Sequence, residues 1–133
     1  MEYKVLIVDD DPDTLSLLSH LLIKKGYHVE TSLTMKEALK KIQEDKPDLV
    51  LIDIIMDNGG GRQLAEKIRE TYDSDEIRLI YSSVMKKDKY EEKYGEQDMD
   101  ELGICFYLHK PFNIREFLGV VEETLLDVNN RLK

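Results

Sequence analysis

Short apolar runs alternate with amphipathic stretches along the chain, and this alternation constrains the fold more than any other feature of the sequence. The most apolar run covers residues 49–52, and comparable runs cover residues 5–8 and 105–108. A short run without polar interruptions is typical of a strand that is buried on both faces. The stretches between the runs repeat apolar residues at helical spacing. The pattern therefore predicts an α/β protein whose parallel strands are joined by right-handed helical crossovers.

Five strands and five helices are expected. The strands lie at residues 5–8, 27–32, 49–52, 77–81 and 105–108. The second of them is half polar, which indicates an edge strand. Helix starts are marked by Asp11 before Pro12, by Thr34 three residues before Glu37, and by Asn113, because these side chains can accept hydrogen bonds from the first helical turn. The remaining two helices are predicted around residues 64–68 and, as a single very polar helix, over residues 85–102.

The length and the charge of the chain restrict its class. A chain of 133 residues fits one domain, which we expect to cover residues 1–133. Its 19 basic and 28 acidic residues give a formal net charge of −9. A net-negative chain without a basic stripe is a poor candidate for binding nucleic acid. The surplus acid suits a cation or a partner with a basic face.

The sequence also predicts where the protein works. No apolar stretch approaches the roughly 20 residues that a membrane span needs, and no signal peptide precedes the first strand. We therefore expect a cytoplasmic protein that does not enter a membrane. The one cysteine, Cys105, cannot form an internal disulfide, and its apolar neighbours in the sequence predict a buried structural thiol.

Polar side chains follow four of the five predicted strands. They are Asp9, Asp10 and Asp11 after the first strand, Asp53 after the third, Ser82 and Ser83 after the fourth, and Lys110 near the end of the fifth. In open parallel sheets, ligands bind beyond the carboxyl ends of the strands, where the strand order reverses. We therefore expect these side chains to converge at one edge of the sheet although they are far apart in sequence.

This set of residues is suited to phosphoryl transfer. Clustered carboxylates repel one another, and a divalent cation such as Mg²⁺ relieves the repulsion while it keeps free positions for a phosphate. Asp11 can cap the following helix, so Asp9 and Asp10 are the carboxylates left to bind metal. Asp53 can act as a nucleophile and form an acyl phosphate. Lys110 and the Ser82 hydroxyl can then neutralise and bind the phosphoryl oxygens.

Four segments carry a resemblance to a known family. They are VLIVDDDPDTL at residues 5–15, PDLVLIDIIM at 47–56, LIYSS at 79–83 and FYLHKPF at 106–112. Over nearly its whole length the chain resembles the receiver domain of two-component response regulators. The resemblance implies a flavodoxin-like, doubly wound, five-stranded parallel sheet in the order 2-1-3-4-5 with five helices.

The resemblance also implies a metal site and an acceptor. Asp9 and Asp10 match the family's acidic pair, with Asp10 as a direct ligand of the metal and Asp9 acting largely through water. Asp53 matches the phosphoacceptor, which is also a metal ligand, and the backbone carbonyl of Ile55 would complete the protein ligands. The implied ion is Mg²⁺, with Mn²⁺ as the alternative.

Three further positions match residues that respond to phosphorylation in the family. Ser82 matches the switch hydroxyl, Tyr107 the switch aromatic residue, and Lys110 the phosphate-binding lysine. The peptide bond before Pro111 is expected to be cis. A histidine kinase or a phosphotransfer protein would donate the phosphoryl group. The signal would pass to a separate effector or a dimer mate through the fourth helix and the fifth strand, so the expected role is signalling, with at most self-catalysed phosphotransfer and autodephosphorylation.

The chain departs from the family pattern in the loop after Asp53. The family usually has proline where Asp57 stands and an acidic or amide residue where Gly60 stands, whereas Gly61 matches. Because glycine admits many backbone conformations, we expect the loop over residues 58–61 to be looser than usual. Neither Ile55 nor Val84, beside the expected acceptor, can orient an attacking water, which predicts a long-lived acyl phosphate.

A second departure is the stretch from residue 82 to 107, which is longer than is typical of the family. It contains Tyr90, Tyr94 and Met99. We interpret the two tyrosines as packing residues, with a partner surface as the alternative reading.

Two other functions remain open at this point. A phosphatase of the haloacid dehalogenase type also uses an aspartyl phosphate, Mg²⁺, a hydroxyl and a lysine. Its motif would need threonine or valine at Asp13, its nucleophile would be Asp9, and Asp53 would have no role. A receiver-like module that binds partners without phosphorylation is the other alternative, and the altered loop at Asp57 and Gly60 is what favours it.

Overall fold

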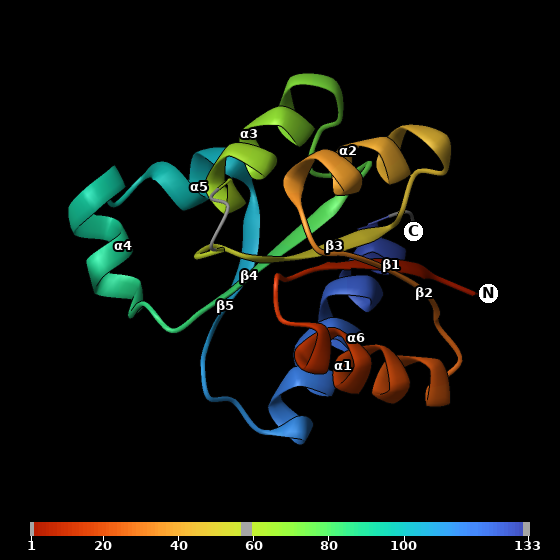
Figure 1. Ribbon diagram of the computed structural model, residues 1–133. Coiled ribbons are helices and arrows are strands. Elements are labelled where there is room, and N and C mark those ends of the chain that lie inside the picture. The colour runs from red at the N-terminus through yellow and green to blue at the C-terminus, as the bar shows by residue number, and fades with distance from the viewer. Residues whose placement is uncertain (1, 57–59, 132–133) are drawn as a thin grey trace.

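Five parallel strands form one sheet in the order β2-β1-β3-β4-β5 (Figure 1). The computed structural model describes residues 2–56 and 60–131, and of residues 127–131 it describes only the course of the helix. The strands are β1 (Lys4–Val8), β2 (His28–Ser32), β3 (Leu49–Asp53), β4 (Arg78–Ser83) and β5 (Ile104–His109). The helices are α1 (Pro12–Lys24), α2 (Met35–Glu44), α3 (Gly61–Thr71), α4 (Lys87–Tyr94), α5 (Asp98–Leu102) and α6 (Ile114–Arg131). The predicted fold and strand order are confirmed.

Successive side chains of each strand point to opposite faces of the sheet, so the core consists of two layers. In β1, Val5 and Ile7 face the helices α1 and α6, whereas Leu6 and Val8 face α2 and α3. Figure 1 shows α1 and α6 on one side of the sheet, and α2, α3 and α5 on the other. Every residue of β3 is buried, while β2 at the edge has one buried residue, as the sequence predicted. Among the described residues, no helix combines the length and the apolar character needed to cross a bilayer.

The predicted helix caps are present. The Asp11 side chain accepts a hydrogen bond from the backbone N–H of Asp13 at 3.1 Å. Thr34 caps α2 in the same way, and the Asn113 side chain accepts from the N–H of Glu116 at 2.7 Å. Since Asp11 provides the cap, the two preceding aspartates remain available at the end of β1.

The prediction of one helix over residues 85–102, and hence of five helices, is wrong. The segment forms two helices, α4 and α5, which makes six helices among the described residues. The break lies at Gly95, whose φ of +99° is incompatible with a continuing α-helix. In α4 only Tyr90 is buried, so the interpretation of this tyrosine as a packing residue is confirmed.

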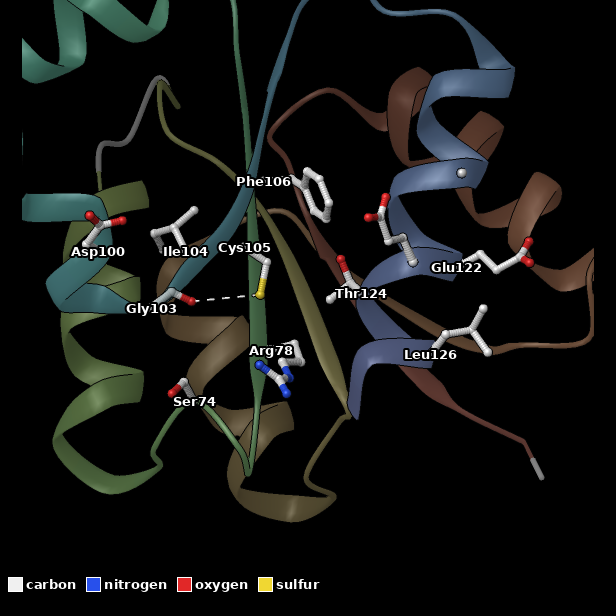
Figure 2. A pocket seen from close by; sticks show the side chains of 12 residues that line it. Ser74, Arg78, Asp100, Gly103, Ile104, Cys105, Phe106, Glu122, Thr124 and Leu126 are labelled. Carbon is white, nitrogen blue, oxygen red and sulfur yellow. Dashed lines mark hydrogen bonds between the residues drawn. The ribbon is translucent and has the colours of Figure 1, made fainter. Parts of the chain in front are cut away.

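Cys105 is partly buried rather than fully buried as predicted. It lies in a groove between β5 and α6, which Arg78, Phe106 and Glu122 also line (Figure 2). The difference follows from the position of β5 at the edge of the sheet, where one side of the strand has no neighbouring strand.

The start of α3 packs directly against the end of β3, so a larger residue at Gly61 should destabilise the protein. A Cβ atom at Gly61 would lie 2.5 Å from the Asp53 carbonyl oxygen and from Ile54 backbone atoms. We expect Gly61→Ala to lower the free energy of unfolding by about 2–3 kcal/mol, because backbone must shift to relieve the overlap. At Gly119 in α6 a Cβ would meet nothing within 4 Å. As a control, Gly119→Ala should raise stability by about 0.5–1 kcal/mol, and urea denaturation measures both changes.

Equal unfolding midpoints for the two glycine variants would contradict this close packing between α3 and the end of β3.

Candidate functional site

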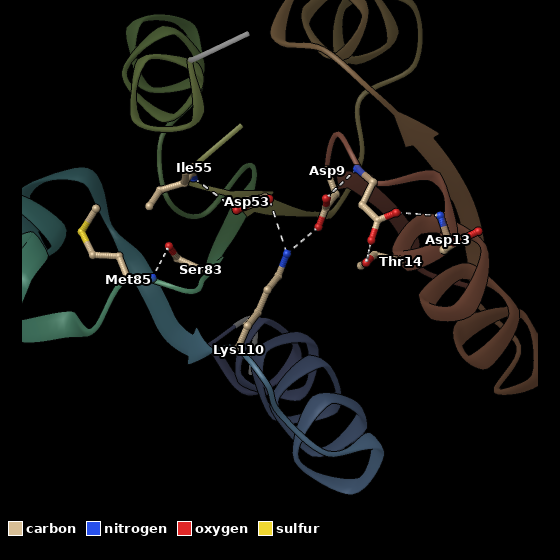
Figure 3. Close-up of polar contacts among 9 residues, drawn as sticks. Asp9, Asp13, Thr14, Asp53, Ile55, Ser83, Met85 and Lys110 are labelled. Atoms are coloured by element: carbon tan, nitrogen blue, oxygen red, sulfur yellow. Dashed lines mark hydrogen bonds and ion pairs between the residues drawn. The ribbon is translucent and has the colours of Figure 1, made fainter. Parts of the chain in front are cut away.

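Three charged side chains from distant parts of the sequence meet at the carboxyl ends of β1, β3 and β5. The Lys110 ammonium donates to Asp9 Oδ2 at 2.8 Å and to Asp53 Oδ2 at 3.4 Å (Figure 3). Asp9 and Asp53 are only 2% and 5% exposed, so the two ion pairs are buried from most of the solvent. The predicted convergence of Asp9, Asp53 and Lys110 is therefore observed, and the pairing of Lys110 with Asp9 adds a contact that the sequence did not indicate.

The second oxygen of each buried carboxylate is held by backbone. Asp9 Oδ1 accepts from the N–H of Asp11 at 2.9 Å, and Asp53 Oδ1 accepts from the N–H of Ile55 at 3.2 Å. Each carboxylate is thus fixed between a backbone donor and the Lys110 ammonium. Their orientations are set before any ligand arrives.

The carboxylates form a cluster that fits a divalent cation. Asp9, Asp10 and Asp53 can each offer one oxygen, and these oxygens lie within 4.8 Å of one another. Three ionised carboxylates and the Lys110 ammonium, which reaches two of them, leave a net charge of −2. Oxygen ligands with this surplus charge are the donor set that Mg²⁺ and Mn²⁺ prefer.

The environment shifts the pKa values of Asp53 and Lys110. Burial raises the pKa of Asp53 to about 6; the Lys110 charge opposes this rise, and the Asp9 charge adds to it. Burial alone would lower the pKa of Lys110, but its hydrogen bond to Asp9 and the two carboxylate charges raise it overall. Near neutral pH the lysine is therefore charged, and Asp53 is mostly an ionised carboxylate of raised basicity.

The two serines at the end of β4 have different surroundings. Ser82 is the strand partner of Asp53, and both are buried. Ser83 Oγ accepts a hydrogen bond from the N–H of Met85 at 3.0 Å, so this hydroxyl supports the turn after β4 (Figure 3). Of the two, Ser82 is better placed to meet a group bound on Asp53.

Tyr107 contacts the loop that leads into α4. Its hydroxyl donates to the Met85 carbonyl at 2.5 Å, and its ring is partly buried. His109, from the same strand, places a ring nitrogen 3.1 Å from the Val84 carbonyl, which can only accept. The loop after β4 is therefore held to β5 by two side chains, of which the sequence singled out only Tyr107.

Two residues near Asp53, Ile55 and Val84, are apolar and exposed. Ile55 is 46% exposed and Val84 is 66% exposed. The peptide bond between Lys110 and Pro111 is cis, as the sequence resemblance predicted. The predicted departures at Asp57 and in the loop fall partly outside the described residues, which resume at Gly60 with a φ of +100°.

Sequence reasoning missed a second polar cluster, in which Arg62 and Tyr90 both donate hydrogen bonds to Asp98. The residues come from three helices, and no motif links them. The unusual length of the segment between β4 and β5 was the only signal that pointed to this region.

Comparisons with known proteins agree with this geometry. The sequence model of the response regulator receiver domain matches residues 5–122. The alkaline phosphatase synthesis transcriptional regulatory protein PhoP of Bacillus subtilis is 33% identical over 125 residues, which cover 94% of this chain and 49% of PhoP. The chain thus spans about half the length of this curated relative.

Two solved structures illustrate the similarity in three dimensions. A CheY-like receiver domain protein of Methanospirillum hungatei JF-1 has a TM-score of 0.86 and 27% identity, with 98% of this chain and 99% of that chain covered. TrrA of Thermotoga maritima, solved in complex with Mg²⁺ and beryllium fluoride, has a TM-score of 0.75 and 30% identity, with 92% and 98% covered.

The family match decides against the haloacid dehalogenase alternative, since it includes the strand ends that carry the candidate site. The chain belongs to the response regulator receiver domain family and is a receiver domain of two-component signal transduction.

Proposed function

We propose that Asp53 is the phosphoacceptor of this receiver domain and that its phosphorylation depends on Mg²⁺. The observation that carries the proposal is the position of the Lys110 ammonium between Asp9 and Asp53, within the cluster that includes Asp10. A buried, ionised carboxylate is suited to receive a transferred phosphoryl group when an ammonium beside it can neutralise charge on the phosphoryl oxygens.

Asp53 attacks the phosphorus of a phosphohistidine with a carboxylate oxygen. The new O–P bond forms as the P–N bond breaks, and the histidine nitrogen keeps the electron pair. The Ile55 N–H holds one Asp53 oxygen, which leaves the oxygen near Lys110 to react. Lys110 and the Ser82 hydroxyl then donate to phosphoryl oxygens.

The residues that would hold the metal are Asp9, Asp10, Asp53 and the carbonyl of Ile55. Bound there, Mg²⁺, or Mn²⁺ in its place, would neutralise charge on the phosphoryl oxygens. The complex of the similar protein TrrA with Mg²⁺ and beryllium fluoride supports this assignment.

Ser82 and Tyr107 form the proposed switch. When Ser82 and Lys110 turn toward the phosphoryl group, Tyr107 leaves the Met85 carbonyl and moves into the space beside Ser82. This shifts the population of a two-state surface around α4 and β5, where an effector or a dimer mate binds. A histidine kinase or phosphotransfer protein is the proposed donor, and a cytoplasmic location is part of the same proposal.

The role is signalling rather than turnover of a substrate, with autodephosphorylation as the only further chemistry. PhoP is a transcriptional regulatory protein by its name, and this chain matches about half of it. We therefore assign the response to Asp53 phosphorylation to a surface that binds a partner. Direct DNA contacts by this domain are not part of the proposal, because its net charge is −9.

Phosphorylation itself is the first test. After incubation with acetyl phosphate and Mg²⁺, we expect the intact mass to rise by one phosphoryl group. Asp53→Ala should abolish the gain, because it removes the nucleophile, and EDTA should abolish it in the natural chain. Asp48→Asn, at a partly exposed position before β3, serves as the control and should gain the same mass.

A gain of mass in Asp53→Ala would assign the acceptor to another residue. If the natural chain neither gains mass nor binds beryllofluoride, the phosphorylation-independent module becomes the better description.

The apolar side chains of Ile55 and Val84 predict slow hydrolysis of the acyl phosphate. Ile55 and Val84 offer no side-chain group that could orient an attacking water, so the natural chain should retain its phosphoryl group for minutes or longer. Ile55→Asn should shorten the lifetime severalfold, because an amide can hold the water. Ile114→Asn, at a similarly exposed position in α6, is the matched control. The decay of the phosphorylated mass measures the lifetime, and decay within seconds in the natural chain would overturn the prediction.

The buried carboxylate cluster also predicts a dependence of stability on pH. The folded pKa of Asp53, about 6, lies above its ordinary value of 3.8. The folded chain therefore binds this proton more tightly than the unfolded chain, and stability falls as the pH rises from 3.8 to about 6. Asp53→Asn should consequently be more stable than the natural chain by about 2 kcal/mol at pH 7, with little difference near pH 4.

Urea denaturation in EDTA at both pH values measures this difference, and added Mg²⁺ should narrow it at pH 7. An Asp53→Asn variant that is less stable than the natural chain at pH 7 would refute the expected cost of burying the Asp53 charge.

A further inference from the structure

A chain of hydrogen-bonded side chains joins four elements on the α3 side of the sheet. Arg62 of α3 donates to both oxygens of Asp98 in α5, from Nε at 2.9 Å and from Nη2 at 2.5 Å. The hydroxyl of Tyr90 in α4 donates to Asp98 Oδ2 at 2.5 Å. The hydroxyl of Tyr81 in β4 lies 3.1 Å from that of Tyr90. Only the Arg62 end of the chain approaches solvent.

The donor and acceptor properties of these side chains fix the direction of each hydrogen bond between them. The ionised Asp98 carboxylate can only accept, so Tyr90 gives it its single proton, and Tyr81 must donate to the Tyr90 oxygen. The Arg62 hydrogen bonds lower the pKa of Asp98, and burial raises the pKa of Tyr81 to about 12. The donors and acceptors therefore keep these roles over the physiological pH range.

Helix α4 has few other anchors, whereas α5 is also held by the Arg69 side chain, which donates to the Leu102 carbonyl at 2.6 Å. Tyr90 is the one buried residue of α4, and Asp98 and Met99 are the buried residues of α5. The guanidinium of Arg62 also lies 4.6 Å from the ring centroid of Tyr94, which packs on Tyr90 at 4.7 Å. Because α4 is otherwise polar, its position depends on the contacts around Tyr90 and Asp98.

Tyr107 connects this chain to the acceptor end of the sheet. Its ring meets those of Tyr81 and Tyr90 edge-on, with centroids 6.4 and 6.3 Å away. Its hydroxyl holds the Met85 carbonyl, two residues before α4 begins. A movement of Tyr107 would therefore remove a contact from both tyrosines and release the start of α4 at the same time.

We propose that the side chains of Arg62, Asp98, Tyr90 and Tyr81 form a latch that holds α4 and α5 against α3, and that Tyr107 releases it. The coupling rests on the proposed phosphorylation of Asp53, whereas the latch itself does not. In the phosphorylated domain Tyr107 withdraws from the aromatic cluster, and the α4–α5 segment becomes free to rearrange for a partner. The phosphorylation signal thus reaches α3 and α5 as well as the β5 surface.

Hydrogen exchange measured by mass spectrometry on the unphosphorylated protein tests the latch. Tyr90→Phe removes one hydroxyl and keeps the ring packing. It should speed exchange over residues 87–102 on the order of tenfold, the factor that a lost hydrogen bond to a charged group produces. Tyr94→Phe removes a hydroxyl from the same helix and keeps the contacts to Asp98, so its exchange should match the natural chain. Exchange in β3 should be unchanged in both variants, which shows that they fold.

Should Tyr90→Phe fail to fold, Tyr81→Phe provides the second variant. It removes the hydroxyl that donates to Tyr90, keeps the ring packing, and should likewise speed exchange over residues 87–102. Unchanged exchange over residues 87–102 in a folded Tyr90→Phe overturns the latch.

The coupling is tested by repeating the measurement after acetyl phosphate and Mg²⁺, with phosphoryl uptake read from the intact mass. Phosphorylation should speed exchange over residues 87–102 in the natural chain and add little in Tyr90→Phe, although both take up the phosphoryl group. Equal added acceleration in both proteins overturns the coupling. Absence of uptake by the natural chain contradicts the proposed function instead, and the unphosphorylated comparison still decides whether the latch exists.

Discussion

One ammonium group between two buried carboxylates determines how the functional edge of this domain is organised. Lys110 ties the segment after β5 to the ends of β1 and β3 through Asp9 and Asp53. Inside a poorly hydrated site such pairs are strongly attractive, while the carboxylates alone would repel each other. The pairing with Lys110 therefore lets the two carboxylates lie close together, and the surplus negative charge that remains favours a divalent cation.

The rest of the fold offsets the unfavourable electrostatics of this edge. The raised pKa of Asp53 reflects a carboxylate held where burial disfavours its charge. Two apolar layers compensate, one under α1 and α6 and the other under α2 and α3. The absence of a side chain at Gly61 lets the start of α3 pack closely against the end of β3. Charged side chains are concentrated at the strand ends, as is usual where a protein performs its function.

The sequence predicted the parts that depend on local chemistry. Apolar runs identified all five strands, and Asp11, Thr34 and Asn113 marked three helix starts, because a cap needs only its own first turn. The single helix expected over residues 85–102 was wrong, since the left-handed φ of Gly95 is a backbone choice that polar composition does not reveal. The contacts among Arg62, Asp98 and Tyr90 join residues up to 36 positions apart, and no periodicity in the sequence encodes them.

The sequence by itself determined the class of fold, the strand order through its family resemblance, and the set of groups at the sheet edge. It could do so because hydrophobic periodicity and strand-end residues are local properties. Only the tertiary structure decided that Lys110 pairs with Asp9 as well as Asp53, and that Ser83 supports a turn while Ser82 lies beside Asp53. It also decided that Tyr107 reaches the network around Tyr90. These contacts depend on strand register and helix packing, which arise from the whole chain at once.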